Sequence, residues 1–166
     1  MDALLFNTSV GLRLTPAQVA QEIVRFMRED AEREYKVTIG TDSMRLAGHM
    51  ADFVTAIVVH RVGRGGRYFW RRIEEDNFHT LRDRITREVL MSLDIATGFL
   101  TAFDEAKMAA KVPIPRYDFE IHVDVGENGA TKAMIQELVG MVRAHNFTAK
   151  TKPESYAASN VADKHT

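Results

Sequence analysis

The amino-acid sequence predicts an α/β fold in which a mixed five-stranded sheet is flanked by helices. Strand-like and helix-like segments follow one another in the order helix, then β-β-β-α-β-α-β-α. The length of 166 residues favours one domain, and 45% hydrophobic with 27% charged residues is the balance of a globular chain that buries a core. We therefore expect one domain over 1–166, with an N-terminal extension and helix over 1–35 and the core over 36–166.

The first helix has a clear start signal. Thr15 suits the N-cap, Pro16 suits the first helical position, and Gln18 completes a capping box. Apolar residues then recur at helical spacing, and the polar run that follows extends the predicted helix to Glu34. These apolar residues are Val19, Ile23, Phe26 and Met27.

Three strands joined by short turns follow this helix. Residues 36–43 alternate as a strand does, and residues 53–61 are β-branched and apolar. Residues 67–73 return after a turn at 63–66, whose glycines supply the positive φ angles of a hairpin. Short connections join antiparallel neighbours, so these strands are expected to form an antiparallel meander.

The second half of the chain alternates helix and strand, which is typical of parallel crossovers. An amphipathic helix is predicted from about Thr80 to about Phe103, and Pro113 and Pro115 mark the loop after it. The remaining predicted elements are, in order, a strand over 117–125, a turn over 126–129, a helix over 131–144, a short strand over 147–150 and a tail over 152–166.

Composition and charge narrow the possible function. Cysteine is absent, which excludes disulfides, zinc–thiolate sites and thiol nucleophiles. No signal-peptide pattern and no apolar stretch of the ~20 residues that span a membrane are found, so we expect a cytoplasmic protein. The net charge of −1 disfavours nonspecific coating of nucleic acid. Any nucleic-acid binding must then use a local basic patch or bound metal ions.

Two aspartates are predicted at matching strand ends. Asp42 follows the core residues of the first sheet strand, and Asp124 has the equivalent place on the fourth, before a turn. Ligands of open α/β sheets bind outside the carboxyl ends of the strands, and Mg²⁺ prefers carboxylate oxygens. One such aspartate alone would be interpreted as a turn cap. The matched pair favours a site for a divalent cation.

Helical geometry selects a third carboxylate. At 100° per residue, Glu88 lies at the edge of the apolar stripe of the long helix, whereas Asp83 and Asp94 lie on the opposite, solvated side. A carboxylate beside a buried stripe needs a cation or a hydrogen-bond donor. A metal ion would supply this partner, and so would a neighbouring arginine.

The tail offers two further candidates, Asp163 and its rival Glu154, if it folds back over the sheet. A surface helix with a serine cap explains the same residues equally well. His122 shares a strand face with Asp124, but a histidine packed under a helix is the commoner case. Several arginines could contact phosphates, although solvated faces have the same composition. They are Arg64, Arg67, Arg71, Arg72, Arg82, Arg84 and Arg87.

Two motifs that would indicate other chemistry are incomplete. The segment GENGATK at 126–132 has two residues between its glycines, whereas a P-loop needs four. The segment GTDS at 40–43 lacks the glycines that flank the serine of a nucleophile elbow. The sequence therefore predicts neither a P-loop nucleotide site nor a serine hydrolase.

Four segments closely resemble the YkuK-type family of bacterial proteins, which are RNase H-like and predicted to be RNase H-related nucleases. They are VTIGTDS, TAIVVHRVGRGGRYF, IHVDVGENGATK and KPESYAASNVADKHT, and the resemblance runs from about Val37 to the end of the chain. It implies the RNase H-like fold, with which the order of elements agrees. The chain has no strongly basic protrusion like those with which some RNases H grip RNA–DNA hybrids.

The resemblance also implies a four-carboxylate site. RNase H-type nucleases have an aspartate on the first strand, a glutamate on the helix after the third, an aspartate ending the fourth strand and a last one in a C-terminal helix. The residues that fill those places in order are Asp42, Glu88, Asp124 and Asp163. The sequence NVAD at 160–163 resembles the pattern around the last aspartate and favours Asp163 over Glu154.

The implied function is metal-dependent hydrolysis of phosphodiester bonds in a nucleic acid. Two Mg²⁺ or Mn²⁺ ions about 4 Å apart would be bridged by Asp42, with Glu88 and Asp124 on one side and Asp163 on the water-activating side. Two alternatives stay open. One is a nucleic-acid- or protein-binding module that retains the fold without turnover. The other is a nucleotide phosphotransfer enzyme, for whose two-domain form the chain is too short.

Overall fold

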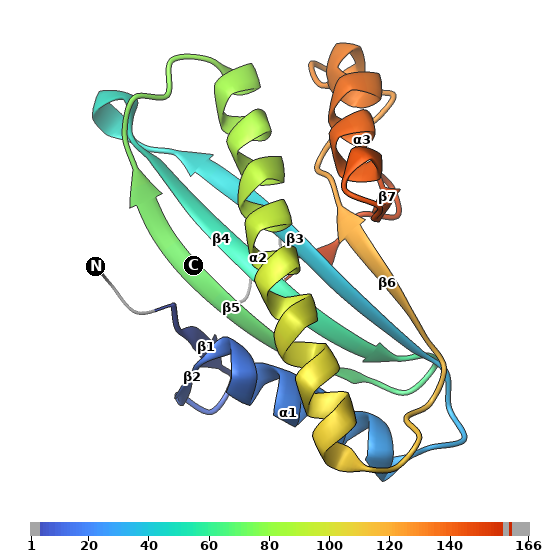
Figure 1. Ribbon diagram of the computed structural model, residues 1–166. Helices are drawn as coiled ribbons and strands as arrows, with labels where there is room; N and C mark the ends of the chain where they lie inside the picture. The colour runs from blue at the N-terminus through green and yellow to red at the C-terminus, as the bar shows by residue number, and fades with distance from the viewer. Residues whose placement is uncertain (1–3, 158–159, 161–166) are drawn as a thin grey trace.

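A mixed sheet with the strand order β2-β1-β5-β4-β3-β6-β7 organises the protein (Figure 1). The computed structural model describes residues 4–157 and residue 160. The α/β class and the mixed sheet are confirmed. The seven strands are β1 (Phe6–Thr8), β2 (Arg13–Leu14), β3 (Tyr35–Arg45), β4 (Ala51–Arg61), β5 (Gly66–Glu75), β6 (Tyr117–His122) and β7 (Thr148–Lys150).

The predicted number of five strands is wrong, because the N-terminal extension adds β1 and β2 to the sheet edge. Their three and two residues are too short to show strand alternation in a sequence. They form because β1 pairs antiparallel with β5, and β2 folds back onto β1. Phe6 of β1 is completely buried, so this short hairpin is also attached to the core.

The helices are α1 (Pro16–Glu29), α2 (Leu81–Ala110) and α3 (Ile135–Ala144), with short 3₁₀ turns η1 (Ala47–His49) and η2 (Lys132–Met134). The capping box of Thr15 and Gln18 is confirmed, with both hydrogen bonds formed. Helix α1 ends five residues earlier than predicted. The Tyr35 hydroxyl donates a hydrogen bond to the carbonyl of Asp30, and the chain then enters β3.

Helix α2 is longer than predicted, continuing from Phe103 to Ala110. The apolar stripe weakens after Phe103, but the residues that follow are mostly strong helix formers such as alanine, glutamate, lysine and methionine. The helix ends where Lys111 adopts the left-handed conformation, two residues before Pro113. Among the described residues, no helix is both long and apolar enough to cross a membrane.

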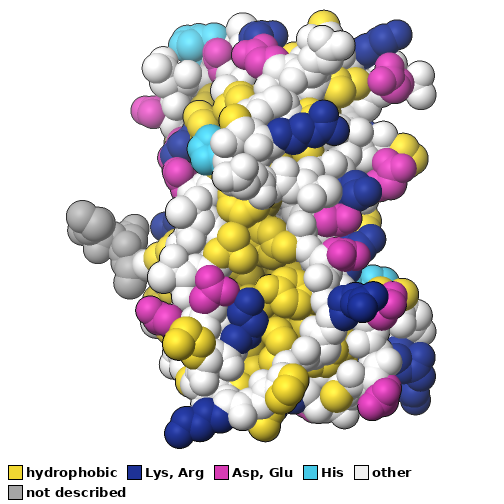
Figure 2. All heavy atoms as spheres, turned by 45° about the vertical axis from the view of Figure 1, so that its right-hand side comes forward, with side chains coloured by type: hydrophobic (Ala, Val, Ile, Leu, Met, Phe, Trp, Pro, Cys, Tyr) yellow, Lys and Arg dark blue, Asp and Glu magenta, His cyan; other side chains and the backbone are white. Residues whose placement is uncertain are grey.

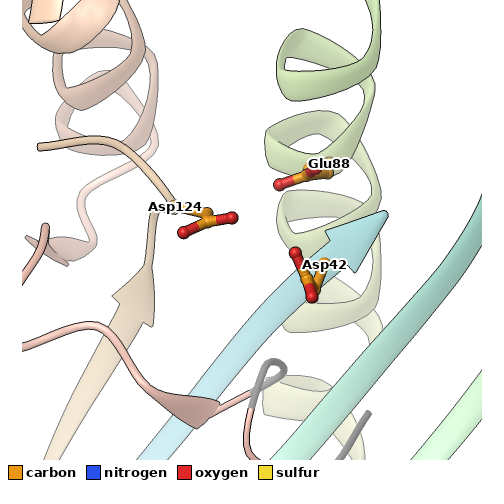
Figure 3. Close-up of side chains that lie close together, drawn as sticks. All are labelled: Asp42, Glu88 and Asp124. Carbon is orange, nitrogen blue, oxygen red and sulfur yellow. The ribbon is translucent and has the colours of Figure 1, made fainter. Parts of the chain in front are cut away.

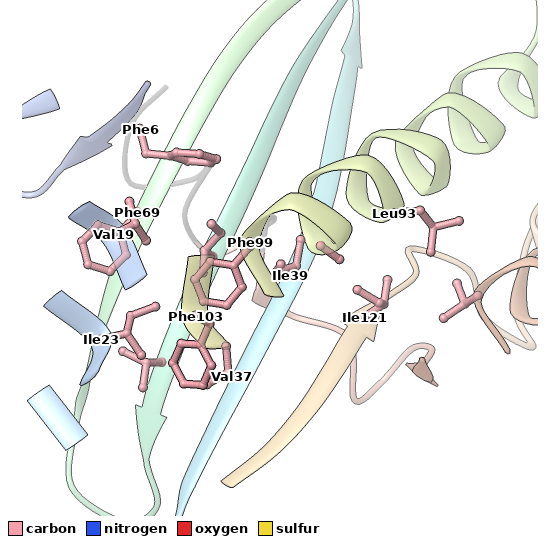
Figure 4. Packing of buried hydrophobic residues seen from close by; sticks show 14 of the residues in the cluster. Phe6, Val19, Ile23, Val37, Ile39, Phe69, Leu93, Phe99, Phe103 and Ile121 are labelled. Atoms are coloured by element: carbon pink, nitrogen blue, oxygen red, sulfur yellow. The ribbon is translucent and has the colours of Figure 1, made fainter. Parts of the chain in front are cut away.

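The main core lies between the sheet and its helices, with buried residues from α1, α2 and α3 in one cluster (Figure 4). Figure 2 shows hydrophobic side chains in a band along this face, because α3 covers only one end of it. Phe119 of β6 is half-buried, and its ring centroid lies 6.2 Å from that of Phe99 on α2 and 5.7 Å from that of Phe147. Packing in this core thus holds α2, the helix that carries Glu88, in a fixed position against β3.

Candidate metal centre

The site lies where two neighbouring strands stop pairing. β3 and β6 run parallel as far as the pair Gly40↔His122. Beyond it, β3 stays paired with β4 up to Arg45↔Ala51, while the chain after β6 bonds to the β7 side, where the Val123 amide donates to the Lys150 carbonyl at 2.8 Å. The two strands are held by different neighbours, so a crevice opens between them.

Asp42 and Asp124 flank this crevice, each two residues beyond the last β3–β6 pair. The predicted strand ends need correction, because β3 continues for three residues past Asp42, and β6 ends at His122 rather than at Val125. What the two aspartates share is the end of the parallel pairing, not the end of a strand. Asp42 is still opposite Val54 of β4 in the antiparallel ladder.

Helix α2 brings Glu88 to the same crevice. Glu88 is only 2% exposed, and one of its carboxylate oxygens, Oε2, accepts a hydrogen bond from Ser43 Oγ at 2.5 Å. Hydroxyls of Thr41 and Ser92 lie 2.8 Å apart and connect β3 to α2 one turn further along. Asp83 and Asp94 are exposed, as the helical phase predicts. The packing of α2 on β3 thus buries one acidic side chain beside two others.

The three carboxylates point toward one another from α2, from β3 and from the segment after β6 (Figure 3). One oxygen of each lies within 4.8 Å of an oxygen of the other two. Within residues 4–157 and 160, these are the acidic or histidine side chains that come together in a group of three or more able to share a metal ion.

Burial and repulsion between neighbouring acids favour the protonated forms of Asp42 and Glu88. Burial, with a further contribution from the charge of Asp124, raises the pKa of Asp42 to about 6. Burial also raises the pKa of Glu88 well above its usual value, and Asp42 and Asp124 add to the effect. For Asp42 and Glu88, the positive charges of Lys152 and Arg84 therefore do not offset burial and the neighbouring acids.

The group has the properties of a divalent-cation site. Glu88 Oε1 is buried and has no hydrogen-bond partner, which is costly for a carboxylate. A cavity of about 10 Å³ beside Asp42 and Asp124 has room for roughly one water-sized ligand. Hard cations such as Mg²⁺ and Mn²⁺ prefer an all-carboxylate set of this kind. The residues present therefore fit the metal that the sequence resemblance implies.

His122 lines this cavity and anchors the tail. Its Nδ1 accepts hydrogen bonds from the amides of Tyr156 and Ala157, at 3.0 and 3.2 Å. The prediction of a buried, packed histidine is confirmed: His122 is 5% exposed, and the tail covers it where a helical turn begins at Ala157. Gly40 permits the close approach, because a Cβ there would lie 3.2 Å from His122 Cβ and 3.6 Å from Ala157 Cβ.

Two cationic residues contact the centre. Lys152 Nζ lies 3.0 Å from Asp124 Oδ1, and Arg84 donates to Ser43 Oγ at 3.0 Å. Lys152 and the hydrogen-bonding Ser43 were missed by sequence reasoning, although Ser43 is adjacent to Asp42. Nothing in the sequence separates Lys152 from other surface lysines, because its position depends on how the tail folds back.

Of the two tail candidates, Glu154 is exposed and does not belong to the acidic group, and Asp163 lies outside the described residues. Three of the arginines considered for phosphate contact have acidic protein partners. Arg72 pairs with Asp52, Arg82 with Glu137, and Arg87 with Glu75. Those ion pairs explain these arginines without a bound nucleic acid.

Comparisons with known proteins agree with this architecture. The sequence profile of the family described as Ribonuclease H-like matches residues 18–166. The uncharacterized protein YkuK of Bacillus subtilis (strain 168) is 30% identical over 170 residues, which cover 99% of this chain and 98% of that relative. No solved structure matches the chain. The resemblance found in the sequence is thereby confirmed, and the chain belongs to the ribonuclease H-like family.

Proposed function

We propose that this protein is a metal-dependent nuclease that hydrolyses phosphodiester bonds in a nucleic acid. The observation that carries the proposal is Glu88, which is 2% exposed, faces Asp42 and Asp124, and has one oxygen without a hydrogen-bond partner. Within the described part of the chain it makes no direct ion pair. A purely structural carboxylate in that position would be a large cost to folding. Membership of the ribonuclease H-like family supports the same assignment.

Asp42, Glu88 and Asp124 would hold the metal, and Asp163 remains the proposed fourth carboxylate. Two bound Mg²⁺ or Mn²⁺ ions would supply an activated water for in-line attack on phosphorus and stabilise the leaving oxygen. Ser43 orients Glu88 through its hydroxyl, and the Thr41–Ser92 contact holds α2 at the distance that brings Glu88 to the strands. These hydrogen bonds around the proposed ligands fix the geometry of the carboxylates before substrate binds.

The substrate contact is proposed to be local and dependent on the metal. A net charge of −1 gives no general attraction for a polyanion. Bound divalent ions would reverse the charge of the crevice and create an attractive point for a phosphodiester. The protein is therefore expected to bind nucleic acid much more tightly with metal than in EDTA.

The test is Mn²⁺ binding and cleavage by Asp42→Asn. We expect the wild type to bind Mn²⁺ in calorimetry and to cleave at least one of single-stranded DNA, duplex DNA, RNA and RNA–DNA hybrid with Mg²⁺ or Mn²⁺. D42N should lose both, with cleavage reduced more than about 100-fold, because the central ligand is gone. Asp94→Asn, the same change at an exposed position of α2, should behave as wild type.

The outcomes separate three readings of the site. Wild-type protein that binds no Mn²⁺ would overturn the metal centre. Protein that binds Mn²⁺ and nucleic acid but cleaves none of the four substrates would instead support a binding module that retains the fold. Equal cleavage by D42N and wild type, with circular dichroism showing both folded, would refute the catalytic role of Asp42.

A further inference from the structure

Lys152 makes an ion pair with one of the proposed metal ligands. Its Nζ lies 3.0 Å from Asp124 Oδ1, and its side chain is 55% exposed against 29% for the aspartate. Its charge also acts on Asp42, whose pKa it lowers against the stronger, opposite effects of burial and of Asp124. The ammonium group therefore lies at the open side of the crevice, between the carboxylates and solvent.

The backbone holds Lys152 in this place. Its amide donates to the Val125 carbonyl at 2.8 Å, and its side-chain stem passes so close to Gly126 that a Cβ there would lie 3.0 Å from Lys152 Cβ. The chain then turns, with the Ser155 amide bonded to the Thr151 carbonyl at 3.0 Å, and is anchored at His122. The backbone of Lys152 is therefore held in place, whereas the ammonium end of its side chain can move.

A metal ion on Asp124 would change the partner of this lysine. A divalent cation carries twice the charge of the ammonium group and binds the carboxylate oxygens directly, so the two cations compete for Asp124 and then repel each other. The ammonium group would stay near the site, because its stem is held, and would be free to contact an anion. A phosphodiester oxygen facing the metal would be the nearest one.

We propose that Lys152 exchanges partners: it pairs with Asp124 in the metal-free protein and binds a phosphate oxygen of the nucleic-acid substrate in the metal-loaded protein. This inference rests on the proposed metal-dependent function and adds to it a substrate-contacting residue. It also explains why one lysine in a mostly exposed tail is held in place by its backbone bond to Val125 and, further along the tail, by the bonds to His122.

The first experiment measures metal affinity without substrate. Lys152→Met removes the charge and keeps most of the side-chain length. We expect Mn²⁺ to bind K152M about 5-fold more tightly than wild type in calorimetry at low salt, because a competing cation is gone. The matched control is Lys111→Met at the far end of α2, about 35 Å along the helix from Glu88. K111M should bind Mn²⁺ like wild type, since solvent and salt screen its charge.

The second experiment measures nucleic-acid affinity by fluorescence anisotropy, with Ca²⁺ in place of Mg²⁺ to limit cleavage and with the same four nucleic acids. With Ca²⁺, K152M should bind the preferred nucleic acid about 10-fold more weakly than wild type, because one charged phosphate contact is lost. In EDTA the two proteins should differ little, because Lys152 is then paired with Asp124. K111M should match wild type under both conditions.

The results distinguish this inference from the proposed function. If wild type binds no Mn²⁺, both fail. If wild type binds Mn²⁺ and K152M binds it with unchanged affinity, the competition for Asp124 is refuted while the metal centre stands. If K152M loses equal nucleic-acid affinity with Ca²⁺ and in EDTA, Lys152 is a permanent electrostatic contact and the exchange of partners is wrong.

Discussion

Acidic side chains in two regions of this molecule have opposite electrostatic surroundings. Asp52, 3% exposed on β4, contacts the guanidinium of Arg72 on β5, and Glu120, 6% exposed on β6, lies between Lys36 and Lys150 at 3.8 and 3.9 Å. Glu88 is buried as deeply but faces two more carboxylates. The first group brings its own cations, whereas the second has an excess of negative charge.

Carboxylates that pair with a cation and carboxylates that lie beside other acids differ in the direction of their pKa shifts. The pKa of Glu75 is lowered, chiefly because Arg87 hydrogen-bonds to its carboxylate, and the pKa of Arg72 is raised by its bond to Asp52. The pKa values of Asp42 and Glu88 are raised instead, first by burial and then by neighbouring acids. Burial of an acid therefore says little about function. A group of acids with too few neighbouring cations is the stronger indication of a ligand that supplies positive charge.

Breaking the matched pair should have the largest effect on stability. Arg72→Met leaves the Asp52 carboxylate buried without its cation, and we expect the free energy of unfolding in urea to fall by about 3 kcal/mol. Mn²⁺ affinity should stay within about 2-fold of wild type, since Arg72 does not contact the centre. Arg64→Met, at the exposed hairpin, is the control and should cost less than about 0.5 kcal/mol. A stability equal to wild type in R72M would remove the distinction between the two groups.

Lowering the pH should weaken metal binding at the unmatched group. The metal needs an ionised Asp42, and the raised pKa of this residue, about 6, places its protonation between neutral pH and pH 5. Mn²⁺ affinity should therefore be retained above pH 7 and fall about 10-fold per pH unit below 6, with proton release detected by calorimetry in two buffers. An affinity that is constant between pH 7.5 and 5.5 would contradict the raised pKa values.

The smallest expected effect is a gain in stability of the metal-free protein on removing one unmatched charge. The folded state keeps a proton on Asp42 up to pH about 6, whereas the unfolded chain loses it near 3.8, so this residue costs stability above pH 6 and nothing below 4. In EDTA at pH 8, D42N should therefore be more stable than wild type. The gain should be only about 1 kcal/mol, because solvent screens the charge of this partly exposed residue. Asp52→Asn should destabilise instead. A loss in both variants would refute the comparison.

The sequence was sufficient where local chemistry decides the outcome. The capping box at Thr15 fixes the start of α1, and alternation and glycine turns mark the five core strands. Helical phase alone selected Glu88 over Asp83 and Asp94, because burial on one helix face follows from 3.6 residues per turn. Asp42 and Asp124 could be predicted for a related reason, because each is a charged residue that directly follows a run of core residues in the sequence.

Only the tertiary structure decided the features that depend on distant partners. β1 and β2 exist because they pair with β5, not because of any pattern of their own. The crevice opens because β3 stays with β4 while the chain after β6 stays with β7, and no residue type along either strand encodes that separation. Lys152 meets Asp124 across 28 residues of sequence because the tail returns beside the same edge. The sequence by itself singled out Asp42, Glu88 and Asp124, and the divergence of two strands decided that their carboxylates face one another across a crevice.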